Sequence, residues 1–500
     1  RMRRLTAAIS LWLAATAAAA PLGEEGAKRL LTRAGFAPSA AEIARFAALD
    51  QPTAVEELLA PRAATTTVAP PPWVDEAIVS PRALSAMSED ERRAARERAL
   101  RQSLELRGWW LREMTATPAP LLERMTLFWH NHFVSAQPKV RAPQLMYRQN
   151  VLLRRHALGN FGALLHAVAK DPAMLLYLDA ANNRRDAPNE NFAREVMELF
   201  TLGPGHYTER DIKEAARAFT GWSLDAQTGQ FVFRRRLHDD GDKTVLGRTG
   251  RFDGDQVLDL LLAHPATARF IVDKLWREFV SPRVDPQRAE AIAARFRASG
   301  YEIRVALREL LRQPEVVAGS QDDALVKSPV ELVVGFVRQS EAQLEHPVGA
   351  ALAVAAMGQN LFAPPNVRGW PGGEAWINTQ TLLARKQFLE QALARRSAAV
   401  AVMAEEMMSG AGRDTAAMVP AARRQRRSEL AQALAVRVDA AAWLHAIAGV
   451  SPERPVDGPT AQRIAAAVSV LPPVAAPTAS STLALDALRA AVLDPVYQLK

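Results

Sequence analysis

Helical periodicity, interrupted at short intervals by proline or glycine, runs through most of this chain and is the feature that most constrains its fold. Apolar residues make up 49% of the 500 residues, which is enough to form a sizeable core. We therefore expect a mainly α protein, a compact array of many helices. The pattern predicts helices over residues 24–60 (two or three short ones), 87–114, 121–133, 142–157, 160–169, 189–202 and 208–220.

Residues 222–236 depart from this pattern. A turn signal at Thr228 and Gly229 precedes the alternating run Phe231, Val232 and Phe233. Alternation with a period of two predicts strands. We expect a small β-hairpin insert at this point of the helical array.

The amino-terminal residues 1–20 have the composition of a secretory signal peptide. Arg1, Arg3 and Arg4 precede a short apolar segment, and residues 18–20 are all alanine. We therefore expect export to the periplasm or the extracellular space. No later run of 18 or more apolar residues occurs, so no membrane span is expected in the mature chain. We expect residues 24–395 to form a helical core domain and the Ala/Arg-rich, helical residues 396–500 to close the same domain.

Composition excludes several classes of function. The chain has no cysteine, which rules out disulfides, thiolate metal sites and a cysteine nucleophile. The net charge of +8 would suit nucleic acid, but the arginines alternate with glutamate and aspartate, as in "EDERRAARERALRQSLELR". Such alternation is typical of a solvated helix face. Together with the export signal, it predicts no nucleic-acid partner.

Several segments together resemble the exported bacterial family catalogued as "domain of unknown function 1800". They include "RLLTRAGFAPS" (29–39), "RMTLFWHNHFVS" (124–135), "NENFAREVMELFTLGPGHYTERDIKEAARAFTGW" (189–222) and "APPNVRGWPGGEAWINT" (363–379). One departure is Ala37, where the family often has a second glycine. The resemblance implies a secreted or periplasmic helical protein, often encoded beside a second exported protein similar to alkaline phosphatases and sulfatases. It implies no reaction.

The string "HNH" at 130–132 ends the predicted helix 121–133. His132 falls within the apolar face and His130 on its flank, so the two cannot share one ligand on a regular helix. The string is also not the dispersed HNH nuclease signature. For His132 two interpretations remain: a core histidine that donates to a backbone carbonyl, or a functional histidine.

The predicted helix 189–202 carries two carboxylates beside its apolar face. Glu195 lies at the edge of that face, with Asn191 and Glu198 beside it, and Asn191 is a candidate for binding substrate. Carboxylates three residues apart repel each other unless an arginine, a histidine, a shared proton or a metal ion intervenes. The alternative to a functional site is a buried Arg–Glu network.

Two loops carry further candidates. In "RLHDDGDKTVLG", His238, Asp240 and Asp242 are candidate ligands of a divalent cation, although the glutamate of an EF-hand is absent. Lys243 could neutralise this loop or bind substrate, and an ordinary Asp/Gly turn is the alternative. In "NVRGWPGGEAWINT", the candidates for binding a sugar are Arg368, Trp370 and Asn378. The alternative there is a buried tryptophan, with Asn378 capping the next helix.

Two hypotheses from different classes follow. In the first, the protein is an enzyme with a cleft lined by His132, Glu195 and Glu198 and covered by the two loops. These side chains would hydrolyse an envelope or extracellular polymer, either directly or with the help of a divalent cation. In the second, it is a non-catalytic partner or assembly factor for the phosphatase/sulfatase-like neighbour. Glycan binding is a third alternative. The sequence contains no phosphate-binding glycine loop, no G-x-S-x-G and no H-E-x-x-H.

Overall fold

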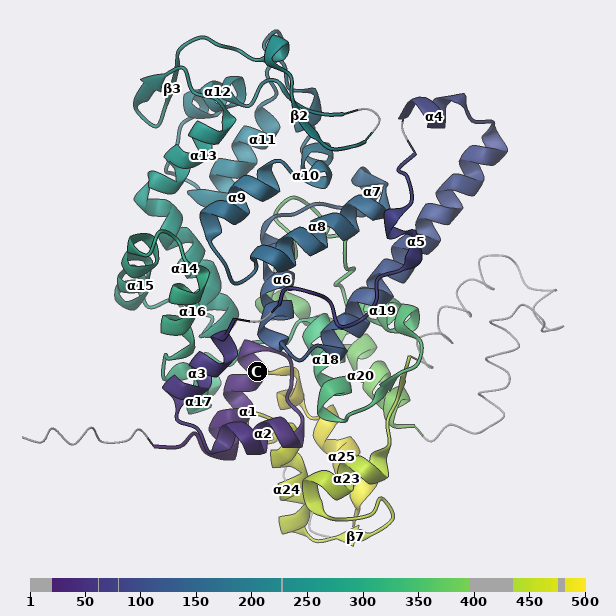
Figure 1. Cartoon of the computed structure of the whole chain (residues 1–500). Coiled ribbons are helices and arrows are strands. Elements are labelled where there is room, and N and C mark those ends of the chain that lie inside the picture. Colours follow the sequence, from purple (N-terminus) through teal and green to yellow (C-terminus); the bar gives the residue numbers. More distant parts are fainter. Residues whose placement is uncertain (1–19, 62, 80, 226–227, 395–434, 475–481) are drawn as a thin grey trace, which may run out of the picture.

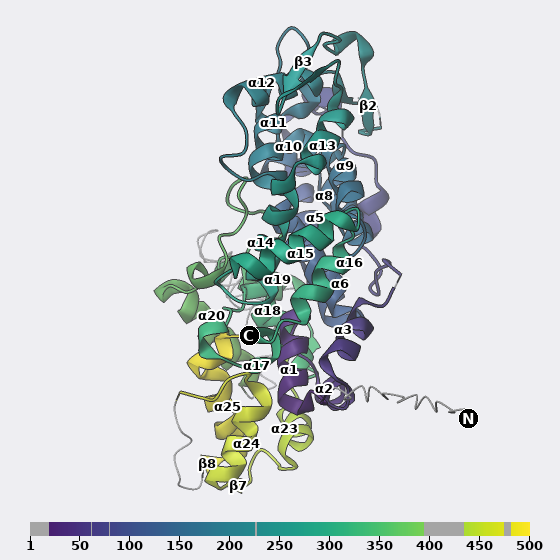
Figure 2. The ribbon, with the colours of Figure 1, turned by 90° about the vertical axis from the view of Figure 1, so that its left-hand side faces the viewer.

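A computed structural model describes residues 20–61, 63–79, 81–225, 228–394, 435–474 and 482–500. The predicted mainly α fold is confirmed: helices form nearly all of the regular structure, with only short two-stranded antiparallel sheets. Figures 1 and 2 show an elongated molecule, with α11, α12 and β3 towards one end and α23, α24 and α25 at the other. The predicted signal peptide lies outside the described residues except for Ala20.

The amino-terminal helices form the three predicted short elements, α1 (Gly23–Ala34), α2 (Ala40–Ala47) and α3 (Gln51–Leu59). Ser39 starts α2 with a capping box and Asp50 caps α3, so local side chains satisfy the first free backbone amides. Helix α1 packs on α2, and α3 packs on α16 (Ile303–Leu311).

The centre of the molecule is built around α5 (Glu89–Ala116), α6 (Pro120–His132), α8 (Pro143–His156), α18 (Pro329–Gln339) and α19 (Pro347–Ala356). The first half of α5 is largely exposed and the second half is buried, with Leu106 and Trp110 fully buried. Helix α18 begins with a capping box between Ser328 and Glu331.

The remaining α-helices before residue 394 are α4 (Pro81–Ala86), α7 (Gln137–Val140), α9 (Phe161–Ala169), α10 (Pro172–Tyr177), α11 (Glu190–Glu195), α12 (Glu209–Ala218), α13 (Gly254–Ala263), α14 (Pro265–Phe279), α15 (Pro286–Ala298), α17 (Glu315–Ala318) and α20 (Thr379–Leu393). Short 3-10 helices are η1 (Pro72–Asp75), η2 (Ala180–Asn182), η4 (Arg235–Leu237), η5 (Gln321–Asp323), η6 (Gly373–Trp376) and η8 (Pro495–Gln498). Element η3 (Val196–Thr201) is a π-helix that directly continues α11.

The predicted hairpin is present as β1 (Trp222–Leu224) paired with β2 (Phe231–Phe233). A second hairpin, β3 (Lys243–Val245) with β4 (Arg248–Gly250), was not predicted. Its two-residue turn, Leu246 and Gly247, has positive φ at both positions (50° and 76°), the geometry that favours hairpins. Leucine rarely adopts that conformation, so the sequence carried no turn signal there.

Most buried apolar residues of the described carboxy-terminal part pack on the same hydrophobic core as the rest of the chain, whereas Val470, Leu471 and Val496 form a small separate cluster. This part forms α23 (Ala440–Ala448), α24 (Gly458–Val468) and α25 (Ala484–Leu493), with β7 (Pro455–Val456) paired to β8 (Thr482–Leu483). Strand β6 (Val436–Arg437) pairs with β5 (Gln343–Leu344), and α25 packs on α20. Residues 396–434 and 475–481 of the predicted closing part lie outside the described residues. None of the helices in the described ranges has the length and apolar character needed to cross a membrane.

Candidate functional site

The string "HNH" ends α6 in the interior of the molecule, and each of its residues holds a different segment. His130 is buried, and its Nε2 accepts a hydrogen bond from the backbone N–H of Phe362 at 3.3 Å. Burial lowers the pKa of His130 to about 3, which keeps the ring neutral. His130 therefore anchors the start of the loop that leads to Trp370.

Asn131 anchors the other end of that loop. Its Oδ1 accepts from the Trp370 backbone N–H at 2.8 Å, and its Nδ2 donates to the Trp370 carbonyl at 3.4 Å. Gly369 makes this approach possible, because a Cβ there would lie 2.2 Å from the Asn131 Oδ1. The backbone of Gly369 also has φ +79°, which favours glycine.

His132 holds the π-helix. Its Nε2 lies 3.1 Å from the Phe200 carbonyl, and its Nδ1 lies 3.0 Å from the Nζ of Lys274. Because a carbonyl can only accept, Nε2 carries the proton and Nδ1 accepts from the lysine. Burial and the Lys274 charge hold the pKa of His132 well below its usual range, and burial lowers the pKa of Lys274 to about 8.

The His132 side chain is 4% exposed and both ring nitrogens are engaged. This geometry differs from the predicted histidine that lines an open cleft, and it matches the alternative of a core histidine donating to a backbone carbonyl. We refer to His130, Asn131 and His132 as the HNH hub. The hub fixes the Phe362–Trp370 loop and the π-helix to the same end of α6.

The π-helix carries the predicted carboxylate pair. Asn189 caps α11 by accepting from the Asn191 N–H at 2.9 Å, and Glu195 ends that helix. The π turn then begins at Val196 and includes Glu198. The π turn ends this helical run, because no helix follows it before α12.

The carboxylate of Glu198 accepts hydrogen bonds from two side chains. The Tyr207 hydroxyl donates to its Oε2 at 3.0 Å, and Arg368 donates to its Oε1 at 2.8 Å. The Arg368 side chain is 69% exposed, so this pair lies at the surface. Burial, followed by the Glu198 carboxylate, raises the pKa of Tyr207 to about 12. The predicted residues Glu198 and Arg368 are thus brought together.

Glu195 differs from its neighbour. It is half-buried, and within the described ranges its carboxyl makes neither a hydrogen bond nor an ion pair. Burial, followed by repulsion from Glu198, raises its pKa, while Arg368 and Arg194 oppose that shift. One turn earlier, Asn191 donates to the Leu178 carbonyl at 3.1 Å. Glu195, Glu198, Arg368 and Tyr207 form the candidate site, which we call the Glu195 site.

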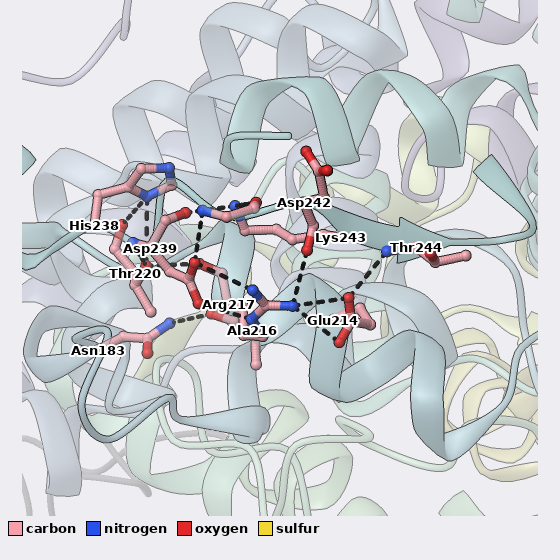
Figure 3. Close-up of polar contacts among 11 residues, drawn as sticks. Asn183, Glu214, Ala216, Arg217, Thr220, His238, Asp239, Asp242, Lys243 and Thr244 are labelled. Carbon is pink, nitrogen blue, oxygen red and sulfur yellow. Dashed lines mark hydrogen bonds and ion pairs between the residues drawn. The ribbon is translucent and has the colours of Figure 1, made fainter. Parts of the chain in front are cut away.

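The loop His238–Lys243 folds around Arg217 (Figure 3). Arg217 donates to Asp239 at 2.7 Å and to Glu214 at 3.0 Å. Lys243 is buried, and its ammonium bonds to the carbonyls of Asp239 and Gly241; burial lowers its pKa. Lys243 therefore closes the loop from inside, where it is inaccessible to a substrate.

The structure does not gather His238, Asp240 and Asp242 as metal ligands. The Nδ1 of His238 faces the Thr220 carbonyl at 2.9 Å, and Asp242 approaches Arg251 at 3.6 Å (Figure 3 draws the first contact). Over the described part of the chain, no group of three or more His, Cys, Asp or Glu side chains could hold a metal ion. The aspartates and glycine instead form a turn held by Arg217 and Lys243, as in the alternative interpretation.

The predicted sugar platform is also not formed. Trp370 and Trp376 are buried, 4% and 7% exposed, so neither ring can stack on a sugar. Asn378 caps α20 by accepting from the Thr381 N–H at 2.9 Å, as the alternative predicted. Of the predicted residues in this loop, Arg368 is the one that reaches the Glu195 site.

Sequence reasoning missed Asn131, Tyr207 and Lys274. Lys274 lies on α14, and its burial beside His132 follows only from the packing of that helix. Tyr207 follows Glu198 by nine residues, beyond the reach of a helical pairing. Asn131 carried a weak signal, since an amide between two histidines at a helix end faces backbone groups that need partners.

Comparisons with known proteins extend the resemblance without adding an activity. Neither curated proteins nor solved structures provided a match. The family model described as "Protein of unknown function (DUF1800)" matches residues 29–499. The match spans nearly the whole chain, and the protein therefore belongs to the DUF1800 family.

Proposed function

We propose that the Glu195 site is the catalytic site of an exported hydrolase, periplasmic or extracellular, that acts on an envelope or extracellular polymer such as a glycan. The observation that carries the proposal is the half-buried carboxyl of Glu195, which has no partner among the described residues and has a raised pKa. Such a carboxyl retains its proton closer to neutral pH than an ordinary glutamate, which suits a general acid.

The two glutamates would have separate roles. Glu195 would give its proton to the leaving oxygen as the bond to that oxygen breaks, while a water attacks the other atom of the bond and returns a proton to Glu195. Glu198, held by Tyr207 and Arg368, would stabilise positive charge that develops at the reacting centre. The exposed guanidinium of Arg368 can also donate to polar groups of the polymer.

His132 acts as a positioning residue in this proposal. Through Phe200 it fixes the π-helix, while His130 and Asn131 fix the loop that carries Arg368. The HNH hub therefore sets the distance between Glu198 and Arg368 without contacting substrate.

A metal-assisted form of the reaction is also testable. Glu195 and Glu198 together offer carboxylate oxygens to a divalent cation, which would activate the attacking water. Elemental analysis by plasma mass spectrometry on protein purified without chelator, beside Glu195→Gln, separates the two forms. A stoichiometric metal that Glu195→Gln abolishes supports the metal-assisted form, and equal metal content in both proteins argues against it.

Hydrolysis is tested by the release of reducing ends from purified peptidoglycan sacculi and from a panel of soluble polysaccharides. We expect Glu195→Gln to lower kcat by about 10²- to 10⁴-fold, the usual contribution of a general acid. Glu190→Gln is the matched control, because Glu190 lies on the same helix and pairs with Arg194 at the surface. Activity should fall as pH rises through the raised pKa of Glu195. Wild-type rates in Glu195→Gln, or no release from any of these polymers, would contradict the proposal.

A second candidate function is that of a non-catalytic partner for a co-encoded phosphatase/sulfatase-like protein. Two observations favour this second function. The histidines of the HNH hub are buried, and Glu198 is paired with Arg368, so these side chains can serve to hold the fold together. Co-purification at micromolar concentration tests this function, and the absence of a complex would count against it.

A further inference from the structure

A pocket lies among the amino-terminal helices. Figures 1 and 2 show these helices, α1, α2 and α3, towards the end of the molecule opposite α11. The pocket lies between α1, α2 and α3 on one side and the ends of α6, α8 and α16 on the other. The pocket has a cavity volume of about 120 Å³. It shares no residue with the Glu195 site.

The floor of this pocket is apolar. Gly35 brings the end of α1 against the start of α6, since a Cβ at that position would lie 2.7 Å from the Cβ of Pro120. The close approach leaves a surface of aliphatic and aromatic side chains facing the pocket, which includes Leu31, Phe36, Phe46, Leu121, Leu122 and Leu158. Such a floor favours a hydrocarbon group over a fully polar ligand.

Three of the five arginines that line the pocket are matched by carboxylates. Arg45 pairs with Glu57 at 3.1 Å, and Arg338 pairs with Glu42 at 2.8 Å. The guanidinium of Arg154 donates two hydrogen bonds to the carboxylate of Glu123. These three therefore leave no net positive charge in the pocket.

The other two, Arg155 and Arg304, are not matched. The Nε of Arg304 donates to the Leu59 carbonyl at 3.1 Å, which leaves its two terminal nitrogens for a ligand. Arg155 is exposed, and within the described ranges neither arginine forms an ion pair. Two uncompensated guanidinium groups at the edge of an apolar floor attract an anion.

We propose that this pocket binds an amphiphilic anion, a molecule whose hydrocarbon chain lies on the apolar floor and whose carboxylate or phosphate head pairs with Arg155 and Arg304. The combination decides the class of ligand: a purely apolar molecule would leave both arginines unused, and a bare anion would leave the floor unused. The proposal does not depend on the hydrolase proposal, because the residues are different.

Isothermal titration calorimetry on the full chain tests this site with four probes: octyl phosphate, octanoate, octyltrimethylammonium and inorganic phosphate. We expect octyl phosphate or octanoate to bind, and the tighter of the two identifies the head group. Replacing both arginines (Arg155→Gln with Arg304→Gln) should weaken that binding by about ten-fold or more, since a hydrogen bond to a charged group contributes ~1.5–3 kcal/mol.

Arg155→Gln alone guards against a folding defect, because the Arg155 side chain has no partner to lose within the described part of the chain, and it should weaken binding by a smaller factor. Arg236→Gln is the matched control, because Arg236 is also exposed but lies on η4, outside the pocket. The affinity of this variant for the probe should stay within about two-fold of wild type. The proposal would be overturned by no binding of either anionic probe, by unchanged affinity in the double variant, or by equal affinity for octyltrimethylammonium. Inorganic phosphate binding as tightly as octyl phosphate would also overturn it, because the floor would then contribute nothing.

Discussion

Glu123 and Glu195 are both glutamates next to the core of the same helical array, yet they are in opposite electrostatic situations. Glu123 is 1% exposed and receives two hydrogen bonds from Arg154, at 2.5 and 2.9 Å, and one from the Trp110 indole at 2.9 Å. Glu195 is half-buried, has no such partner among the described residues and faces the negative charge of Glu198. The more deeply buried carboxylate is therefore the better satisfied one.

The difference shows that burial alone does not mark a functional carboxylate. A buried charge whose hydrogen bonds are complete stabilises a particular packing and is closed to other chemistry. A partly exposed carboxyl with an unfavourable neighbour remains free to exchange a proton or bind a ligand. The HNH hub and the pair of Glu198 and Arg368 show the same difference: the hub histidines are buried and hydrogen-bonded, whereas the pair lies at the surface.

The largest effect is expected from Glu123→Gln. The variant keeps the size of the side chain but leaves the Arg154 guanidinium buried without its carboxylate, which typically costs about 3–5 kcal/mol. Urea unfolding followed by tryptophan fluorescence measures this loss as a lower midpoint. Adding Arg154→Met should recover much of the stability, because no unpaired charge then remains in the core. An unchanged midpoint in Glu123→Gln would contradict the role of this pair.

A smaller effect is expected from Gly369→Ala. The new Cβ would lie 2.2 Å from the Asn131 Oδ1, so the loop must move, and Arg368 would move with it away from Glu198. We expect a loss of about 1–3 kcal/mol from strain and a weaker candidate site. Gly372→Ala is the matched control, because Gly372 has a similar φ of +72° but no atom within 4 Å of the added Cβ. Thermal unfolding of the two variants should therefore differ, and equal values would show that Asn131 does not hold the loop.

The helices and the first hairpin could be predicted because their signals are local. The alternation at Phe231 depends on residues a few positions apart, and the predicted hairpin is confirmed. The same local reasoning recognised Glu195 and Glu198 as a pair on one helix. The second hairpin was not predicted, because its turn begins with Leu246 and leucine is not a typical turn residue.

The partners of the candidate site could not be predicted, because they are distant in the sequence. Arg368 is 170 residues from Glu198, and Trp370 is 239 residues from Asn131. The same limit explains why Trp370 was a candidate sugar platform: whether a tryptophan is buried or exposed depends on the elements that pack over it. Sequence pattern identifies which residues carry charge on a helix face, and only packing decides which of those charges are matched.

The smallest effect is expected from Glu195→Gln on stability, and its sign tests the comparison with Glu123 directly. At pH 7 the substitution removes the repulsion between carboxylates at i and i+3, so the variant should be more stable than wild type by about 0.2–0.5 kcal/mol. Because the pKa of Glu195 is raised above its ordinary value of 4.5, the folded protein holds this proton more tightly than the unfolded chain. Wild type should therefore lose stability as pH rises from about 4.5 through the raised pKa, and Glu195→Gln should not. Thermal unfolding between pH 4 and pH 8, with Glu190→Gln as the control, measures both effects. A loss of stability in Glu195→Gln at pH 7 would mean that the carboxylate has a stabilising partner, as Glu123 does, and the two glutamates would then no longer differ in kind.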